Sequence, residues 1–151
     1  MFKYRAFLLL PVFALGFLLS GCIVVREYPA AEKTAEVKKQ EIEIARELVK
    51  AFVTNDAKAF VSLLPEEVRT KFNEESFART RKAVTDSVGE PISFTYLTSL
   101  ELPALTPQIW KIRFSRVNLK KEQEFTSELL FKVITGMTDK KSAVITSFQF
   151  I

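Results

Sequence analysis

The sequence of 151 residues contains no histidine and only one cysteine. Ser–His and Cys–His catalytic pairs need a histidine as the general base. Zinc sites are built largely from histidine and cysteine side chains, and haem iron takes its protein ligands from a similarly short set. The two shortages therefore exclude those nucleophilic pairs, zinc sites and haem ligation. We expect no metal and no cofactor.

Glycine is also scarce, and of the four glycines only Gly89 and Gly136 follow residue 22. Ten of the fourteen phenylalanines lie in that same part of the chain, together with Trp110. A chain of this length has room for one domain and buries roughly two thirds of its unfolded surface. It can therefore form a hydrophobic core without disulfides.

The formal charge of +4 overstates the basic character of the main part of the chain. Lys3 and Arg5 belong to the first 21 residues, which contain no acid, so 20 basic and 18 acidic side chains remain after them. Nucleic-acid binding usually requires a concentrated basic stripe. We expect no nucleic-acid partner.

The first five residues form a short, positively charged segment, and residues 6–20 form an almost unbroken apolar run. Fifteen residues of helix cover about 22 Å, whereas the hydrocarbon core of a bilayer is about 30 Å thick. The run is therefore too short for a comfortable transmembrane span, and it is typical of a signal peptide over residues 1–21.

The segment Leu19-Ser20-Gly21-Cys22 ends this run and resembles the lipobox of bacterial lipoprotein precursors. The resemblance implies cleavage between Gly21 and Cys22, diacylglycerol on the Cys22 sulfur, and a protein exported and lipid-anchored to a membrane of the cell envelope. Ile23, and not aspartate, follows the cysteine, which in an organism with two membranes implies the outer membrane, facing the periplasm. The alternative is an uncleaved anchor with an incidental cysteine.

Residues 22–40 are interpreted as the lipid attachment site and a tether, and helices follow. Over residues 41–53 an apolar face is predicted from Ile42, Ala45, Val49 and Phe52, while Glu41 is assigned to the polar remainder. Asp56 is expected to cap a short second helix, and a third begins near Pro65. A longer helix is predicted from Asn73 to Gly89.

After Pro91 the apolar period changes to two, which predicts four consecutive antiparallel strands with turns at residues 103–107 and 135–139. Helices followed by such strands indicate an α+β domain with its helices on one face of a curved sheet. The residues predicted to point inward from the first three strands are Ile92, Phe94, Tyr96, Thr98, Leu100, Trp110, Ile112, Phe114, Phe125, Ser127, Leu129, Phe131 and Val133.

Residues 48–65, followed by Phe77, Gly89 and the four strands, resemble the nuclear-transport-factor-like cone fold over residues 41–151. The resemblance implies a cavity between helices and sheet. Ketosteroid-isomerase-like proteins of this fold use a carboxylate base with a tyrosine and a protonated carboxylic acid. None of the predicted inward strand residues is acidic, so we expect a non-catalytic binding domain. The alternative is an isomerase or hydrolase with an acid from a helix, such as Asp86 or Glu90.

Four aromatic residues are predicted to line the pocket and would suit a small apolar ligand: Tyr96, Trp110, Phe114 and Phe131. Core packing is the competing interpretation for each. The outer sheet face carries Leu97, Ile109, Leu130 and Ile134, which indicates either a homodimer or envelope-protein interface or a solvated face. A purely structural envelope component is a third alternative. Lys120-Lys121 and Lys140-Lys141 are expected in hairpin turns, for solubility or for contact with anionic headgroups.

Overall fold

A computed structural model describes residues 33–102, 104–118, 123–138 and 142–151 of the chain. The predicted signal peptide, Cys22 and most of the tether lie outside the described residues, as do both lysine pairs. The lipid anchor therefore stays a prediction. Of the helices in the described ranges, none is long and apolar enough to cross a membrane.

Four helices come first, and side chains cap the starts of three of them. Asp56 accepts a hydrogen bond from the Ala59 amide at 2.9 Å, and Asn73 accepts one from the Ser76 amide at 3.0 Å, as predicted. The third helix follows Pro65, which supplies no side-chain bond. The helices are α1 (Ala35–Val53), α2 (Ala57–Ser62), α3 (Glu66–Arg69) and α4 (Glu74–Val88).

The first helix begins six residues before its predicted start. Thr34 is its N-cap and accepts a hydrogen bond from the Val37 amide at 3.4 Å. Val37, Glu41 and Ala45 are all buried at a spacing of four residues, so one stripe of α1 faces the sheet along nearly its whole length. The assignment of Glu41 to the polar side was wrong. With a predicted start at residue 41, Val37 was left out of the helix, and the buried stripe that runs from Val37 through Glu41 to Ala45 was not recognised.

The four strands form one antiparallel sheet in the order β1-β2-β3-β4, which confirms the predicted α+β class. Both predicted turns were too long. The Pro107 carbonyl accepts a hydrogen bond from the Leu100 amide at 2.9 Å, and Thr135 pairs with Ile145, so these residues belong to strands. The strands are β1 (Glu90–Ser99), β2 (Leu105–Asn118), β3 (Gln123–Met137) and β4 (Ala143–Phe150).

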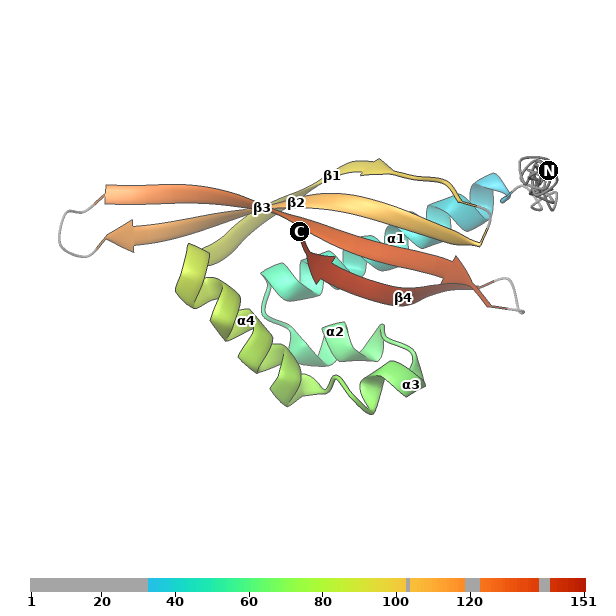
Figure 1. The fold of residues 1–151 in the computed structure, drawn as a ribbon, viewed down its shortest axis with the longest axis horizontal. Coiled ribbons are helices and arrows are strands. Elements are labelled where there is room, and N and C mark those ends of the chain that lie inside the picture. Colours follow the sequence, from blue (N-terminus) through green and yellow to red (C-terminus); the bar gives the residue numbers. More distant parts are fainter. Residues whose placement is uncertain (1–32, 103, 119–122, 139–141) are drawn as a thin grey trace, which may run out of the picture.

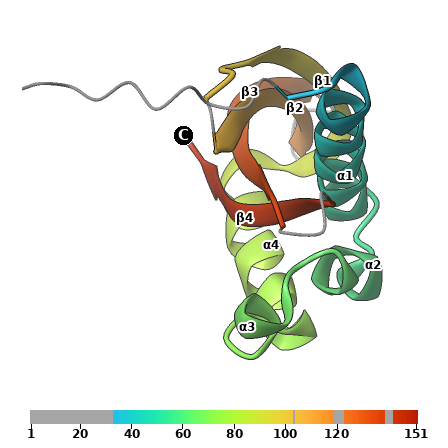
Figure 2. The ribbon, with the colours of Figure 1, turned by 90° about the vertical axis from the view of Figure 1, so that its right-hand side faces the viewer.

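The sheet is strongly curved, and α1 lies across its concave side (Figures 1 and 2). The helix contacts all four strands, while α2, α3 and α4 lie beyond β4 at the other side of the core (Figure 2). Burial of one large apolar side chain stabilises the fold by about 1.5 to 3 kcal/mol. The buried cluster between α1 and the sheet is Leu48, Val49, Phe52, Trp110, Ile112, Phe114, Phe131 and Val133.

Four of the residues predicted to point inward are exposed. Bulges interrupt β1 between Pro91 and Ser93 and between Tyr96 and Thr98, and each adds one residue that reverses the alternation. Ile92 and Thr98 are therefore exposed, and Leu100 lies beyond the strand's end. Phe125 keeps its phase opposite Arg116, but the β2–β3 hairpin there extends past the helices, so its ring is exposed (Figure 1).

Gly89 joins α4 to β1 in a conformation that only glycine adopts without strain. Its φ is 102°, and a Cβ atom built on it would lie 2.3 Å from the Ser115 carbonyl oxygen. The backbones of the helix end and of β2 therefore approach each other closely, which fixes the angle at which α4 leaves the sheet.

The substitution Gly89→Ala should lower the free energy of unfolding by about 2 to 4 kcal/mol, because it adds backbone strain and a steric clash. Urea denaturation followed by circular dichroism measures this. Ser87→Ala, an exposed helical position nearby, is the control and should change stability by no more than about 0.5 kcal/mol. Equal stability of the two variants would contradict the close approach.

Candidate functional site

A cavity of about 130 Å³ lies between α1, α2, α4 and the last two strands. Of the described residues that line it, seven are phenylalanines, and none carries a titratable group. Its two polar lining residues, Thr80 on α4 and Gln149 on β4, are both exposed, so the cavity reaches the surface beside them. The phenylalanines are Phe52, Phe60, Phe72, Phe77, Phe131, Phe148 and Phe150.

These rings hold the cavity open by contacts among themselves. Phe148 meets Phe60 edge-on at a centroid distance of 5.1 Å and Phe72 at 5.2 Å. Phe150 meets Phe52 at 5.2 Å and Phe131 at 4.7 Å. Such pairs contribute about 0.5 to 1.5 kcal/mol each beyond the area they bury. Rigid rings locked edge to face cannot easily collapse into the space between them.

Of the four residues predicted to line a pocket, Phe131 lines this cavity. Trp110 and Phe114 are fully buried farther along the sheet. Tyr96 is half-buried on β1 and packs edge-on against Trp110, with ring centroids 5.1 Å apart. The structure thus brings Tyr96 and Trp110 together, but away from the cavity. The other phenylalanines of the wall come from helices and from β4, and sequence reasoning did not connect them with a site.

The two helix-end acids considered as a pocket base point to solvent. Asp86 pairs with Lys82 at 2.7 Å, and both side chains are exposed. Glu90 pairs with Arg81 at 2.9 Å, and Arg81 also donates to the Phe52 carbonyl at 3.2 Å. Arg81 thus joins α4 to the end of α1 and to the start of β1, and neither acid lines the cavity.

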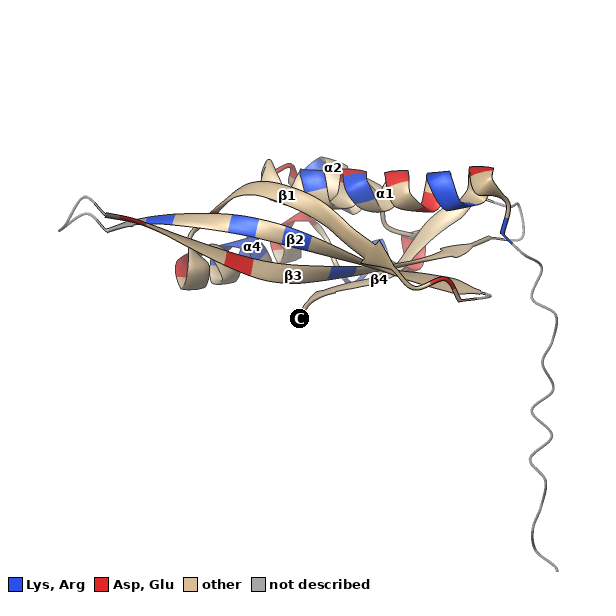
Figure 3. Ribbon diagram, turned by 90° about the horizontal axis from the view of Figure 1, so that it is seen from above, with Lys and Arg blue, Asp and Glu red and all other residues tan. Residues whose placement is uncertain are grey.

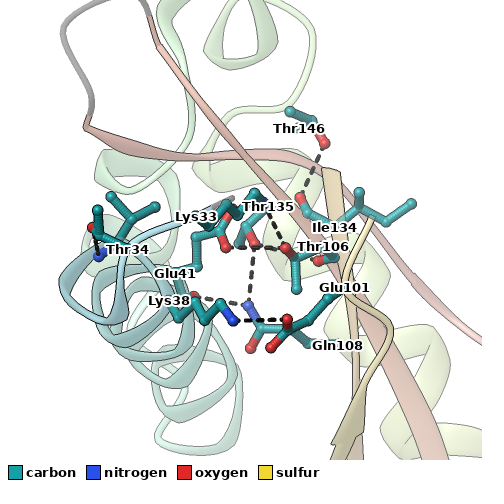
Figure 4. Close-up of polar contacts among 11 residues, drawn as sticks. Lys33, Thr34, Lys38, Glu41, Glu101, Thr106, Gln108, Ile134, Thr135 and Thr146 are labelled. Carbon is teal, nitrogen blue, oxygen red and sulfur yellow. Dashed lines mark hydrogen bonds and ion pairs between the residues drawn. The ribbon is translucent and has the colours of Figure 1, made fainter. Parts of the chain in front are cut away.

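A buried polar cluster lies at the other end of α1 (Figure 4). Glu41 is 1% exposed, and its carboxylate receives hydrogen bonds from the Lys33 ammonium at 2.6 Å and the Thr106 hydroxyl at 3.0 Å. The Lys33 ammonium also donates to the Thr106 hydroxyl at 2.7 Å. The ion pair, with both partners almost wholly buried, joins the first described residue to α1 and β2.

Gln108 and Thr135 extend this cluster into the sheet. The Gln108 side-chain amide donates to the Glu41 carbonyl at 2.8 Å and to the Thr135 hydroxyl at 3.2 Å. Two buried atoms have no hydrogen-bond partner among the described residues, namely Gln108 Oε1 and Trp110 Nε1. Within the polar cluster, the Glu41 carboxylate is thus hydrogen-bonded, whereas the Gln108 side-chain oxygen is not.

Sequence reasoning missed the Glu41 cluster, although one signal for it was present. Extending the apolar stripe of α1 backward by four residues from Ala45 reaches Glu41 and then Val37. A carboxylate between two apolar members of a stripe indicates a buried acid that needs a partner. Its partners, Lys33 and Thr106, are 8 and 65 residues away, and no sequence pattern pointed to them.

The outer face of the sheet mixes charged and apolar side chains. Leu97 and Leu130 are exposed there, whereas Ile109 and Ile134 are only partly so. Lys111 pairs with Glu128 across β2 and β3 at 3.1 Å. Figure 3 shows basic bands along β2, an acidic band on the neighbouring β3, and residues of both signs along α1. Within the described ranges, no group of acidic or cysteine side chains could hold a metal ion.

Comparisons with known proteins find similarity in structure alone. No family model and no curated protein sequence matches the chain. A ketosteroid isomerase-like protein from Erwinia carotovora atroseptica superimposes with a TM-score of 0.56 at 9% identity, covering 78% of this chain and 96% of that one. A protein of unknown function with a cystatin-like fold from Nostoc punctiforme gives 0.52 at 10% identity, covering 80% and 93%.

The fold is the nuclear-transport-factor-like cone. Helices packed on an open, curved, four-stranded antiparallel sheet define it, and the ketosteroid isomerase-like structure shares that arrangement over nearly its whole length. At such low identity the likeness concerns the fold and not the chemistry. The cone of this chain holds a phenylalanine-lined cavity at one end and a buried acid at the other.

The substitution Lys33→Met should lower the free energy of unfolding by about 3 to 5 kcal/mol, because it leaves the Glu41 carboxylate buried without its partner. The double variant Lys33→Met with Glu41→Gln removes both charges and should recover most of that loss. Urea denaturation of the two variants measures the difference. A single variant as stable as the parent chain would contradict the buried ion pair.

Proposed function

We propose that the chain is a lipid-anchored protein of the cell envelope whose cone domain binds a small apolar ligand without catalysing a reaction. The phenylalanine-lined cavity is the observation that carries this proposal. An engineered apolar cavity of about 150 Å³ stays dry and binds benzene or xenon. The cavity here, at about 130 Å³, suits a ligand portion of similar size, such as one aromatic ring or a short length of hydrocarbon chain.

The lining chemistry supports binding over catalysis. General acid–base catalysis needs a titratable group within hydrogen-bond reach of the reacting atoms. The cavity wall offers aromatic rings, one threonine and one glutamine. The buried acid of the cone, Glu41, is engaged by Lys33 and Thr106 at the opposite end of α1.

The lipobox Leu19-Ser20-Gly21-Cys22 supports the anchor. Each buried methylene contributes about 0.8 kcal/mol to membrane attachment, so the two or three acyl chains of a lipoprotein give durable anchoring. The cone would then work as a tethered domain on the exported side of a membrane. In an organism with two membranes we place it on the outer membrane, facing the periplasm.

A second candidate function is docking of a second copy or of another envelope protein on the outer sheet face. The exposure of Leu97 and Leu130 on that face favours it. In this case the cone would serve as a structural or adaptor component, and its cavity would be a packing defect. A catalytic role is the third candidate, and it would require Glu41 to exchange Lys33 for a substrate.

The substitution Cys22→Ala should abolish incorporation of a labelled fatty acid and leave the precursor uncut after Gly21. Metabolic labelling in the native host, followed by intact-mass measurement, tests this. Ile23→Ala keeps the cysteine and should be labelled normally. Labelling that persists in the Cys22→Ala protein would contradict the lipid anchor.

The cavity predicts that the mature protein, purified from its own host, retains an apolar ligand in native mass spectrometry. Thr80→Phe should reduce the retained ligand strongly, because the added ring would stand at the exposed edge of the cavity. Ala83→Phe adds the same ring at an exposed position of α4 outside the lining and is the matched control. Ligand loss in both variants, or in neither, would contradict binding in this cavity.

A further inference from the structure

We infer that the end of the domain beside Lys33 is a membrane-contacting surface that rests on the bilayer carrying the lipid anchor. The inference rests on the proposed anchor at Cys22 and adds an orientation and a second lipid contact to it. The surface, called here the leucine end, consists of Leu100, Leu102, Leu105 and Met137.

The chain enters the domain at this end. The Lys33 ammonium bonds to the Thr106 hydroxyl at 2.7 Å, one residue along β2 from Leu105. The buried ion pair with Glu41 fixes that position. The segment that leads back to Cys22 therefore departs from the domain directly beside the leucine end.

The members of the leucine end are exposed and adjoin one another through the backbone. The Leu102 amide donates to the Leu105 carbonyl at 3.2 Å, and the Leu100 amide to the Pro107 carbonyl at 2.9 Å. Leu105 pairs with Gly136 and covers it, and Met137 follows. Their exposed fractions are 61% for Leu100, 42% for Leu102, 40% for Leu105 and 37% for Met137.

An acid, Glu101, lies between two residues of the leucine end. Glu101 pairs with Lys38 of α1 at 2.9 Å, which places a cation beside the carboxylate. The pair adds no net charge to this surface, and exposed apolar side chains can enter the boundary between headgroups and acyl chains. A free carboxylate there would instead be repelled by an anionic bilayer surface.

The length of the connecting segment keeps this end near the membrane. Eleven residue steps separate Cys22 from Lys33, and a fully extended chain spans at most about 40 Å over that number. The fifteen residues of β3 span roughly 50 Å from the leucine end to the β2–β3 hairpin. The leucine end therefore stays within reach of the bilayer in every orientation. The far hairpin reaches the bilayer only when the long axis of the domain tilts toward the membrane plane.

Two reporter cysteines test this orientation in the mature, acylated protein. Because acylation occupies the Cys22 sulfur and the chain has no other cysteine, an introduced cysteine is the only free thiol. Ala104→Cys places a bimane label within the leucine end, and Thr126→Cys places one at the far hairpin, both at exposed positions. Each protein is reconstituted into phosphatidylethanolamine–phosphatidylglycerol vesicles that contain a doxyl-labelled lipid quencher.

The label at position 104 should lose most of its fluorescence to the quencher, and the label at position 126 should lose almost none. Changing Leu100, Leu102 and Leu105 together to glutamine should abolish the quenching at position 104, with an unchanged circular dichroism spectrum as the check on folding. Equal quenching at both positions, quenching only at position 126, or quenching that survives the leucine changes would overturn the inference.

The experiments distinguish a wrong prediction of the lipid anchor from a wrong prediction of membrane contact at the leucine end. A purified protein without acyl mass on Cys22 that does not float with vesicles would overturn the anchor and this inference together. A protein that is acylated and floats, but whose label at position 104 is not quenched, would overturn the membrane contact alone.

Discussion

The packing of α1 across the concave side of the sheet is the constraint on which the other features of the domain depend. A strongly curved four-stranded sheet leaves one side open, and α1 closes it by contacting all four strands. The buried stripe of the helix changes character along its length. Phe52 near its end packs against Phe77, Phe131 and Phe150, whereas Glu41 near its start meets a lysine and a threonine. These two residues lie about 17 Å apart along the helix axis, at a rise of about 1.5 Å per residue.

The two ends of the cone therefore differ in chemical character. At the apolar end, rings from three helices and two strands meet edge to face and leave a space that no side chain fills. At the polar end, Lys33 bonds to Glu41 of α1 and to Thr106 of β2, so the start of the described chain is joined to the core and not only to the surface. A lone buried ion pair is weak evidence for added stability, but it specifies one arrangement of its partners. Here the arrangement sets where the chain enters the domain at Lys33.

Much of the fold could be predicted from periodicity and capping residues. Asp56, Asn73 and Gly89 marked helix boundaries correctly because each acts locally, through its own neighbours along the chain. The phase of β1 could not be predicted, since its two bulges arise from pairing with β2. The cavity was predicted only through Phe131, because its other rings converge from helices and β4 by tertiary packing. Glu41 was missed because no sequence pattern pointed to its partners and because its helix begins earlier than the apolar spacing suggested.

The central claim is that the phenylalanine wall encloses real apolar space and does not close upon itself. Xenon enters such cavities because it gains dispersion contacts without losing hydrogen bonds. Crystals of the domain placed under xenon pressure therefore give the most direct measurement. The account predicts a xenon atom among Phe52, Phe60, Phe131 and Phe148, with the rings unmoved. A filled or collapsed wall with no xenon density there would contradict it.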